Sequence, residues 1–272
     1  MTGAETVFQT PTVTYSIISL FVFLTGLCIG SFLNVCICRL PEGRSVVSPP
    51  SACPGCGHRL KWWENIPVIS FLLLKGKCSG CGSRISWQYP VVELLTGLLA
   101  LALLHKFHLS LQFAIMFLFS CGLIVVTFID FAHRIIPDVI SLPGIAAGIA
   151  ASFFMPGITW LDSVLGALAG GGVLYLVTWG YYLATGKVGM GGGDIKLLAM
   201  IGAFLGWQSI PFIVFISSLV GAVAGIIFII VSRSGRDYQI PFGPFLAMAA
   251  EIYIFFGSWI LKTYLAGLSP GT

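Results

Sequence analysis

Eight apolar runs constrain the fold of this 272-residue chain more than any other feature. Most of them approach the ~20 residues that a helix needs to cross ~30 Å of hydrocarbon. Only 9% of the residues are charged and 57% are hydrophobic, too few charges to cover a soluble globule. We therefore expect an all-α polytopic membrane protein with these runs as spans, the sixth being short: residues 15–38, 89–105, 111–130, 138–155, 163–184, 195–207, 210–232 and 242–265.

The basic residues predict how these spans are oriented. Met1 to Thr14 contain no Lys or Arg, so they lack the positive region of a cleaved signal peptide, and the first run is expected to be retained. Threading eight spans from an outside N-terminus leaves only Lys106 and Lys262, of fourteen Lys and Arg, outside. Because Lys and Arg are enriched in cytoplasmic loops, we expect both termini outside and residues 39–88 in the cytoplasm. No basic stripe interleaved with aromatic residues indicates nucleic-acid binding.

Four cysteines lie in the long loop between the first and second spans. Cys53 and Cys56 are followed, after twenty-one intervening residues, by Cys78 and Cys81, a spacing typical of tetrahedral zinc sites. Two disulfides are the alternative, but they are rare in the reducing cytoplasm. Four sulfur ligands leave no open position, so the predicted zinc is structural. His58 could replace one thiolate or be a solvated loop histidine.

The division of the chain follows from these two features. Residues 1–38 hold the N-terminal segment and first span, residues 39–88 form the small tetracysteine domain, and residues 89–272 form a seven-helix membrane domain. Glycine pairs spaced four apart indicate close helix packing in three spans: Gly144 and Gly148, Gly166 and Gly170, Gly221 and Gly225.

Two aspartates are the candidate catalytic pair. Asp130 ends the third run, and Asp194 follows Gly191, Gly192 and Gly193 at the start of the sixth, so the threading places both at cytoplasmic ends. An ionisable group in a membrane segment is a functional candidate by default. Asp194 could instead cap its helix, as could Asp138. Capping does not explain Asp130, whose charge opposes the helix macrodipole.

If the two carboxyl groups meet in a wet cavity, repulsion leaves them sharing one proton. The ionised carboxylate then takes a proton from a water molecule, and the protonated one hydrogen-bonds to the scissile carbonyl as water attacks. Peptide hydrolysis by this route needs no covalent intermediate. The glycines before Asp194 would let an extended substrate approach the backbone closely.

The stretch Gly191-Gly192-Gly193-Asp194 is similar to the GxGD motif of intramembrane aspartyl proteases. More narrowly, the chain resembles the bacterial type IV prepilin peptidases that also N-methylate their product. The resemblance runs from the first span to the last and rests on these stretches: Gly30 to Val35 with Arg39-Leu40-Pro41, the cysteine tetrad, Trp63 to Pro67, Tyr89 to Leu94, Asp130 with Ile136-Pro137-Asp138, Gly191 to Leu197, and Ile240 to Pro244.

This resemblance implies a multi-pass enzyme of the bacterial cytoplasmic (inner) membrane with eight spans, in which Asp130 and Asp194 are catalytic. It implies cleavage of a short basic leader after a glycine in type IV prepilins and pseudopilins. It also implies methyl transfer from S-adenosylmethionine to the freed N-terminal residue. The alternatives are a peptidase without methyltransferase activity, and a non-enzymatic membrane transporter or assembly scaffold.

Other residues are assigned to the site by placement. Pro241, Phe242 and Gly243 are similar in position to the proline-containing loop beside the active site of GxGD proteases, although an ordinary helix start is the alternative. Lys196 is expected either to tune the aspartate pair or to snorkel to the interface. Asp138 completes this supporting set.

The residues that hold the methyl donor are not identified by the sequence. No G-x-G-x-x-G opens a strand-to-helix unit, so the methyltransferase part is assigned to residues 39–88 by analogy alone. Glu64 and Glu93 are candidates to bind an amine or the cofactor ribose. Alternatively, they are a solvated loop acid and a helix-end acid.

Overall fold

The computed structural model describes residues 12–187, 189–232 and 241–268. Residues 1–11, part of the stretch Met1 to Thr14 from which a retained first span is expected, and residues 233–240, expected to be cytoplasmic, lie outside these ranges. Within them the regular secondary structure is helical, and the only extended pairing is two isolated bridges, Ala52 with Arg59 and Lys77 with Arg84. The predicted all-α class is therefore confirmed.

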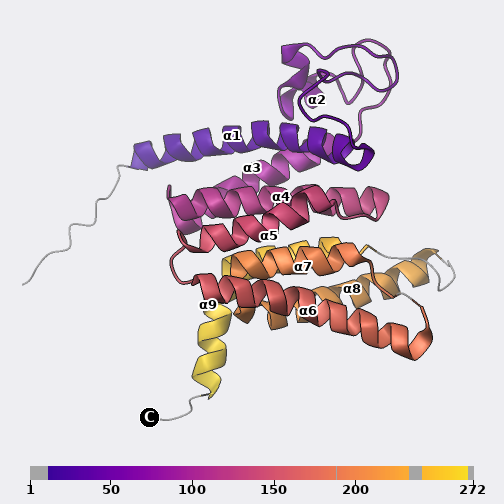
Figure 1. Cartoon of the computed structure of the whole chain (residues 1–272). Coiled ribbons are helices and arrows are strands. Elements are labelled where there is room, and N and C mark those ends of the chain that lie inside the picture. Colours follow the sequence, from indigo (N-terminus) through magenta and orange to yellow (C-terminus); the bar gives the residue numbers. More distant parts are fainter. Residues whose placement is uncertain (1–11, 188, 233–240, 269–272) are drawn as a thin grey trace, which may run out of the picture. The chain divides into compact units, whose positions relative to one another are not determined.

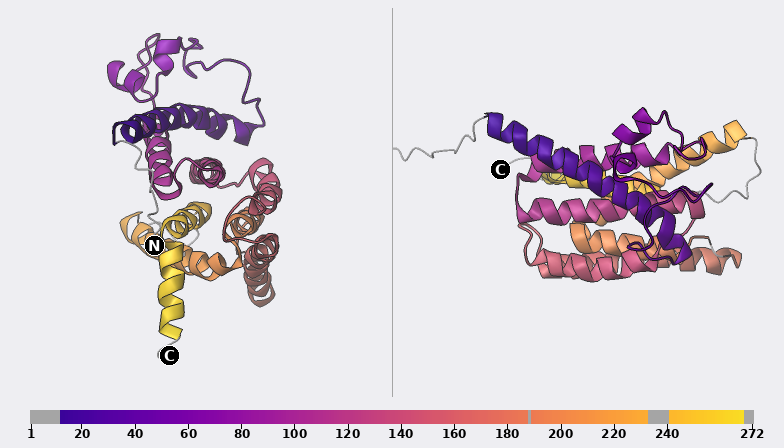
Figure 2. Two further views of the ribbon diagram at one scale, coloured as in Figure 1. Left: turned by 90° about the vertical axis from the view of Figure 1, so that its left-hand side faces the viewer. Right: turned by 90° about the horizontal axis from the view of Figure 1, so that it is seen from above.

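Each of the eight apolar runs overlaps one helix. Figures 1 and 2 show the arrangement of the ribbon in three views. Among the described residues, five helices are long and apolar enough to span a membrane, while α5 and the residues Gly243–Gly257 of α9 are shorter apolar stretches. The total of eight spans remains a prediction. The helices that correspond to the apolar runs are α1 Thr12–Arg39, α3 Gln88–Phe107, α4 Leu111–His133, α5 Asp138–Ser152, α6 Trp160–Thr185, α7 Gly192–Leu205, α8 Ile210–Ser232 and α9 Gly243–Leu268.

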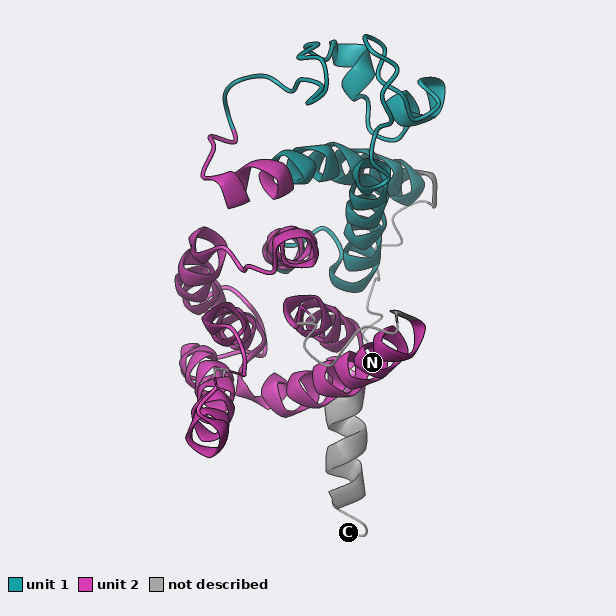
Figure 3. Cartoon of the chain, turned by 90° about the vertical axis from the view of Figure 1, so that its right-hand side faces the viewer, with its two compact units in different colours: residues 1–35, 47–113 teal, residues 36–46, 114–272 magenta. Residues whose placement is uncertain are grey.

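The loop after α1 contains one short helix, α2 (Ile69–Leu73), and two 3-10 turns, η1 (Leu40–Glu42) and η2 (Trp62–Asn65); a third, η3 (Trp207–Ser209), precedes α8. The described chain divides into two compact units, coloured separately in Figure 3. Unit 1 comprises residues 1–35 and 47–113, and unit 2 comprises residues 36–46 and 114–272. The cysteine tetrad lies in unit 1, and both candidate aspartates lie in unit 2.

Helix α7 is the centre of unit 2, with α5 and α6 packed along it. Every residue from Leu197 to Leu205 is buried. Glycines make this close packing possible, because a Cβ atom on Gly166 would overlap the carbonyl oxygen of Gly202 and one on Gly148 would lie 2.8 Å from Ala203 Cβ. The packing role expected for the glycines of α5 and α6 agrees with these contacts.

In unit 1, α1 packs against α3 through glycines of both helices. A Cβ atom on Gly26 would lie 2.9 Å from Gly97 Cα, and one on Gly30 would lie 2.7 Å from Glu93 Cα. The buried Asn34 amide donates to the Tyr89 carbonyl over 3.1 Å. Small residues and one buried polar contact thus hold this helix pair together.

Candidate active site and metal centre

Asp130 lies in the last turn of α4 with 5% of its surface exposed. Its Oδ2 accepts a hydrogen bond of 3.0 Å from the backbone N–H of Gly243, the first residue of α9. A Cβ atom at position 243 would lie only 2.7 Å from that oxygen. The glycine therefore lets a free N–H at the start of one helix reach the carboxylate at the end of another.

Asp194 is the third residue of α7, whose N-cap is Gly191. No side chain makes a capping hydrogen bond there, so the interpretation of Asp194 as the helix cap is wrong. The same holds for Asp138, which follows the N-cap residue Pro137 at the start of α5. Both carboxyl groups are thus available for other interactions.

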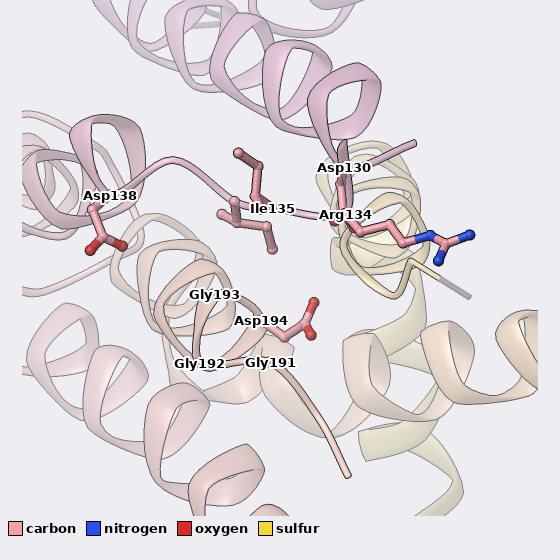
Figure 4. Close-up of a pocket in the computed structure, with 9 residues that line it drawn as sticks. Asp130, Arg134, Ile135, Asp138, Gly191, Gly192, Gly193 and Asp194 are labelled. Carbon is pink, nitrogen blue, oxygen red and sulfur yellow. The ribbon is translucent and has the colours of Figure 1, made fainter. Parts of the chain in front are cut away.

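The two aspartates line one cavity of about 280 Å³ in unit 2. Figure 4 shows the Asp194 carboxylate pointing toward the end of α4 that carries Asp130. The structure therefore brings together two acids that are 64 residues apart in the sequence, with these further residues around them: Arg134, Ile135, Ile136, Asp138, Gly191, Gly192 and Gly193.

The three glycines before Asp194 have different surroundings. A Cβ atom on Gly192 would contact nothing, and the atom nearest to one on Gly191 would be Asp194 Oδ2 at 3.8 Å. These two positions leave the backbone open to the cavity. Gly193 differs, because a Cβ atom there would lie 2.9 Å from Ile136 Cβ. Its role is close packing against the α4–α5 loop.

Three cavity residues were missed by sequence reasoning: Arg134, Ile135 and Ile136. Arg134 follows Asp130 by one helical turn, donates its N–H to the Asp130 carbonyl over 2.9 Å, and has a φ of 56°. A non-glycine residue in this left-handed region marks a sharp end to the helix. In the sequence, Ile136-Pro137 interrupts the helical pattern shortly after Asp130. This short spacing was the signal that the intervening loop lines the site.

Lys196 pairs with Asp138. Its Nζ lies 2.7 Å from both carboxylate oxygens of Asp138, and both side chains are partly exposed. This ion pair joins α7 to α5 beside the cavity. Lys196 therefore has a protein partner beside the cavity, and both expectations for it, tuning of the aspartate pair and snorkelling to the interface, stay predictions.

The segment Pro241-Phe242-Gly243 does reach the candidate site, through the Gly243 N–H. Phe242 directly precedes α9, and its carbonyl accepts hydrogen bonds from the N–H groups of Phe245 and Leu246 in the first turn of that helix. Phe242 also lines a second, mainly apolar cavity of about 320 Å³, together with Met190, which precedes the glycine run. The apolar cavity is thus lined by one residue directly before the glycine run and one directly before Gly243, which bonds to Asp130.

The four cysteines of the tetrad meet at one point. Their sulfur atoms all lie within 4.8 Å of one another, with 3.9 Å between those of Cys53 and Cys81 and 4.0 Å between those of Cys56 and Cys78. A disulfide requires about 2.05 Å, so the paired-disulfide alternative does not fit. Tetrahedral zinc with Zn–S bonds of about 2.3 Å separates its ligands by roughly 3.8 Å. The donor set and spacing therefore fit a zinc ion.

The electrostatics of the tetrad differ from one sulfur to the next. Backbone N–H groups of Gly55 and Cys56 donate to the Cys53 sulfur and lower its pKa to about 6. The His58 N–H favours the Cys56 thiolate, but the neighbouring sulfurs of Cys81 and Cys53 and the loss of water raise the Cys56 pKa to about 12. Metal binding requires the cysteines to be thiolates, and a cation among the sulfurs would relieve the repulsion between their negative charges.

Glu64 and His58 support this centre from outside the sulfur cluster. Glu64 accepts from the Lys61 N–H over 2.8 Å, from His58 Nε2 over 3.1 Å and from the Ser79 hydroxyl. These contacts, led by Ser79, lower the Glu64 pKa to about 2. Because His58 and Ser79 belong to different cysteine knuckles, Glu64 joins them. Its carboxylate is used within the module, which does not support a role in binding an amine or ribose.

Glu93 is also used internally. Its side chain in α3 is buried, and Oε2 accepts a hydrogen bond of 2.7 Å from the Val68 N–H before α2. This contact ties the cysteine module to the start of α3. Neither acid considered for the methyl donor therefore points to a cofactor site.

Known proteins share both halves of this arrangement. Residues 24–107 match the model of the bacterial peptidase A24 N-terminal domain, and residues 117–226 match that of the type IV leader peptidase family. A protein of Pseudomonas aeruginosa named prepilin leader peptidase/N-methyltransferase is 42% identical, over 89% of this chain and 91% of its own length. Its namesakes in Aeromonas salmonicida and Xanthomonas campestris are each 41% identical, over 90% and 89% of this chain and 93% of their own lengths. No solved structure matches the chain significantly.

Proposed function

Because the chain belongs to the type IV leader peptidase family, we propose that Asp130 and Asp194 together hydrolyse the leader of type IV prepilins and pseudopilins after a glycine. The observation that carries this proposal is the single cavity lined by both carboxyl groups. Neither acid is explained by helix capping, and one receives a backbone hydrogen bond that fixes its orientation. The membrane setting is that of a multi-pass inner-membrane protein.

The chemistry follows from two acids that share one proton. The ionised carboxylate removes a proton from a water molecule, whose oxygen attacks the scissile carbonyl carbon. The protonated carboxyl group donates to the carbonyl oxygen as negative charge develops there. Collapse of the tetrahedral intermediate breaks the C–N bond, and the leaving amine takes a proton from the pair. Gly191 and Gly192 leave room for the extended substrate backbone beside Asp194.

Single substitutions test the catalytic pair. Asp130→Asn or Asp194→Asn should abolish leader cleavage in membranes that contain the usual amount of protein, measured by immunoblot, because amide groups cannot exchange the proton. Asp162→Asn is the matched control. Asp162 opens α6 and bonds to Thr159 and Trp207, outside the residues that line the cavity. Cleavage that survives in both Asp130→Asn and Asp194→Asn would eliminate the proposal.

The second activity in the relatives' name is N-methyl transfer. We infer that the freed N-terminal amine attacks the methyl carbon of S-adenosylmethionine. The bond from that carbon to sulfur breaks, S-adenosylhomocysteine is released, and the methylated amine loses a proton. The part of the chain proposed for this step is the domain of residues 39–88, and no residue is assigned to the donor. A peptidase without this activity would leave pre-cleaved pilin unmethylated when the donor is added.

We further propose that the tetrad binds structural zinc. So small a module rarely builds an adequate core without a metal or a cross-link. Cys53→Ser or Cys78→Ser should release metal from purified protein, measured as zinc per chain by mass spectrometry. Cys28→Ser is the control, because this exposed cysteine of α1 lies outside the cluster. Unmutated protein with almost no bound zinc would contradict the proposal.

The orientation proposed from the basic residues places the aspartate cavity and the tetracysteine domain in the cytoplasm and both termini outside. Labelling intact cells with a membrane-impermeant amine reagent should modify Lys106, which follows the apolar part of α3, and spare Lys61, Lys75 and Lys77. The reverse pattern would invert the topology.

A further inference from the structure

Helix α2 presents an apolar face to its surroundings. Ile69, Leu72 and Leu73 occupy positions i, i+3 and i+4 on one side of the helix and are 52%, 66% and 75% exposed. The neighbouring turn η2 packs against α2 and adds Trp62, which is 76% exposed. Contiguous large apolar side chains on a small module mark an interaction surface.

The opposite side of α2 is fixed to the start of α3. The Val68 N–H, just before α2, donates to Glu93 Oε2, and the buried Phe71 ring lies 4.8 Å from the Trp87 ring. Glu93 is the sixth residue of α3, which places it within about 9 Å of the helix start along the axis. Helix α2 therefore lies beside the first two turns of α3.

The start of α3 is where the chain enters the bilayer. This helix has twenty residues and is long and apolar enough to span the hydrocarbon. Trp87 and Tyr89 flank its first residue and are 71% and 38% exposed. Exposed Trp and Tyr at the end of a span occupy the headgroup region. The apolar face of α2 is therefore held at the level of the lipid interface.

The charge around α2 is positive. Residues 47–92 contain five Lys and Arg but a single acid, Glu64, which is hydrogen-bonded within the module. Lys75 and Lys77 directly follow α2, and both are exposed. An apolar helix face next to basic side chains is the pattern of interfacial helices that bind anionic lipid.

We propose that α2 lies in the boundary between headgroups and acyl chains of an anionic phospholipid bilayer. Ile69, Leu72 and Leu73 enter the acyl region, and Lys75 and Lys77 contact lipid phosphates. This contact anchors the tetracysteine module to the membrane surface, in addition to its covalent links to the spans. It is independent of the role of the aspartate pair.

Lipid photo-crosslinking tests this placement in the full-length protein. The protein, carrying a photoreactive amino acid at position 73, is reconstituted into vesicles of phosphatidylcholine and phosphatidylglycerol. Position 176 of α6, where Leu176 is 61% exposed on a span, is the positive control, and the exposed Pro54 of the first knuckle is the comparison position. We expect lipid adducts at positions 73 and 176 and several-fold fewer at position 54.

Three outcomes would overturn the placement: no lipid adduct at position 73 while position 176 is labelled, equal labelling at positions 73 and 54, or a position-73 adduct to a second copy of the chain. A second experiment tests the proposed contact between the two lysines and the lipid phosphates. The double change Lys75→Gln and Lys77→Gln should lower the adduct yield at position 73 in vesicles with phosphatidylglycerol and leave it unchanged in pure phosphatidylcholine. If the double change had the same effect on the adduct yield in both kinds of vesicle, the proposed contact with lipid phosphates would be refuted.

Discussion

At Gly243 the absence of a side chain lets the start of α9 reach Asp130. This contact joins residues 113 apart, so no local pattern in the sequence could predict it. The same is true of the ion pair between Asp138 and Lys196, which are 58 residues apart. The clustering of the four cysteines was predictable, since their spacing is typical of a tetrahedral metal site, and the two acids stood out as charges at the ends of apolar runs.

Gly243→Ala should reduce leader cleavage while the protein still folds. The added Cβ atom would lie 2.7 Å from Asp130 Oδ2 and 3.1 Å from Ile136 Cδ1, so the α9 start must move and the N–H bond is lost. A hydrogen bond to a charged group contributes about 1.5–3 kcal/mol, which corresponds to roughly a 10–150-fold lower rate.

The control for this change is Gly180→Ala in α6, where the added atom would contact nothing within 4 Å. Its cleavage rate should equal that of the unmutated protein. Equal rates for Gly243→Ala and Gly180→Ala would show that the Gly243 contact does not position Asp130.

Helix α7 carries Asp194, and its position is set by the helices packed along it. Apolar runs predicted each helix, but runs alone do not say which helices are neighbours. The four-residue glycine spacings indicated close packing, but only the structure shows which helix packs against these glycines. Helices α5 and α6 both pack against α7. The helix caps were also hard to predict, because Gly191 and not Asp194 precedes the first turn.

Gly166→Ala should destabilise the protein and slow cleavage together. The added methyl group would collide with the Gly202 carbonyl group and push α6 away from α7. Overpacking of this kind typically costs about 1–3 kcal/mol. Thermal unfolding in detergent and the cleavage rate are the measurements, with Gly172→Ala on the same helix as control, since its Cβ atom would contact nothing. Identical unfolding temperatures for the two variants would contradict the packing account.

On the scale of the whole molecule, the tetrad and the aspartates belong to different compact units. The predicted domain limits at residues 38/39 and 88/89 remain predictions, as does the count of eight spans. Composition was sufficient to predict a helical membrane protein, because too few charged residues are present to cover a soluble fold. It could not show that the loop of residues 39–88 is tied to α3 through Glu93 and Trp87.

This separation predicts two independent sites. Asp130→Asn and Asp194→Asn should still methylate pre-cleaved pilin at the unmutated rate, because their changes lie outside unit 1. Transfer of a labelled methyl group to the pilin N-terminus is the measurement. If both variants lost methylation as well as cleavage but kept their zinc, the two reactions would share one site, and the prediction of two independent sites would be wrong.

The central claim is that Asp130 and Asp194 act as one hydrolytic pair within a leader peptidase that also methylates its product. Its most direct test is to incubate purified protein with a prepilin, with and without S-adenosylmethionine, and to measure the mass of the product's N-terminus. We predict loss of the leader in both reactions with unmutated protein and with Asp162→Asn, one added methyl group only when the donor is present, and intact prepilin with Asp130→Asn or Asp194→Asn. A shortened product from either of those two variants would contradict the account.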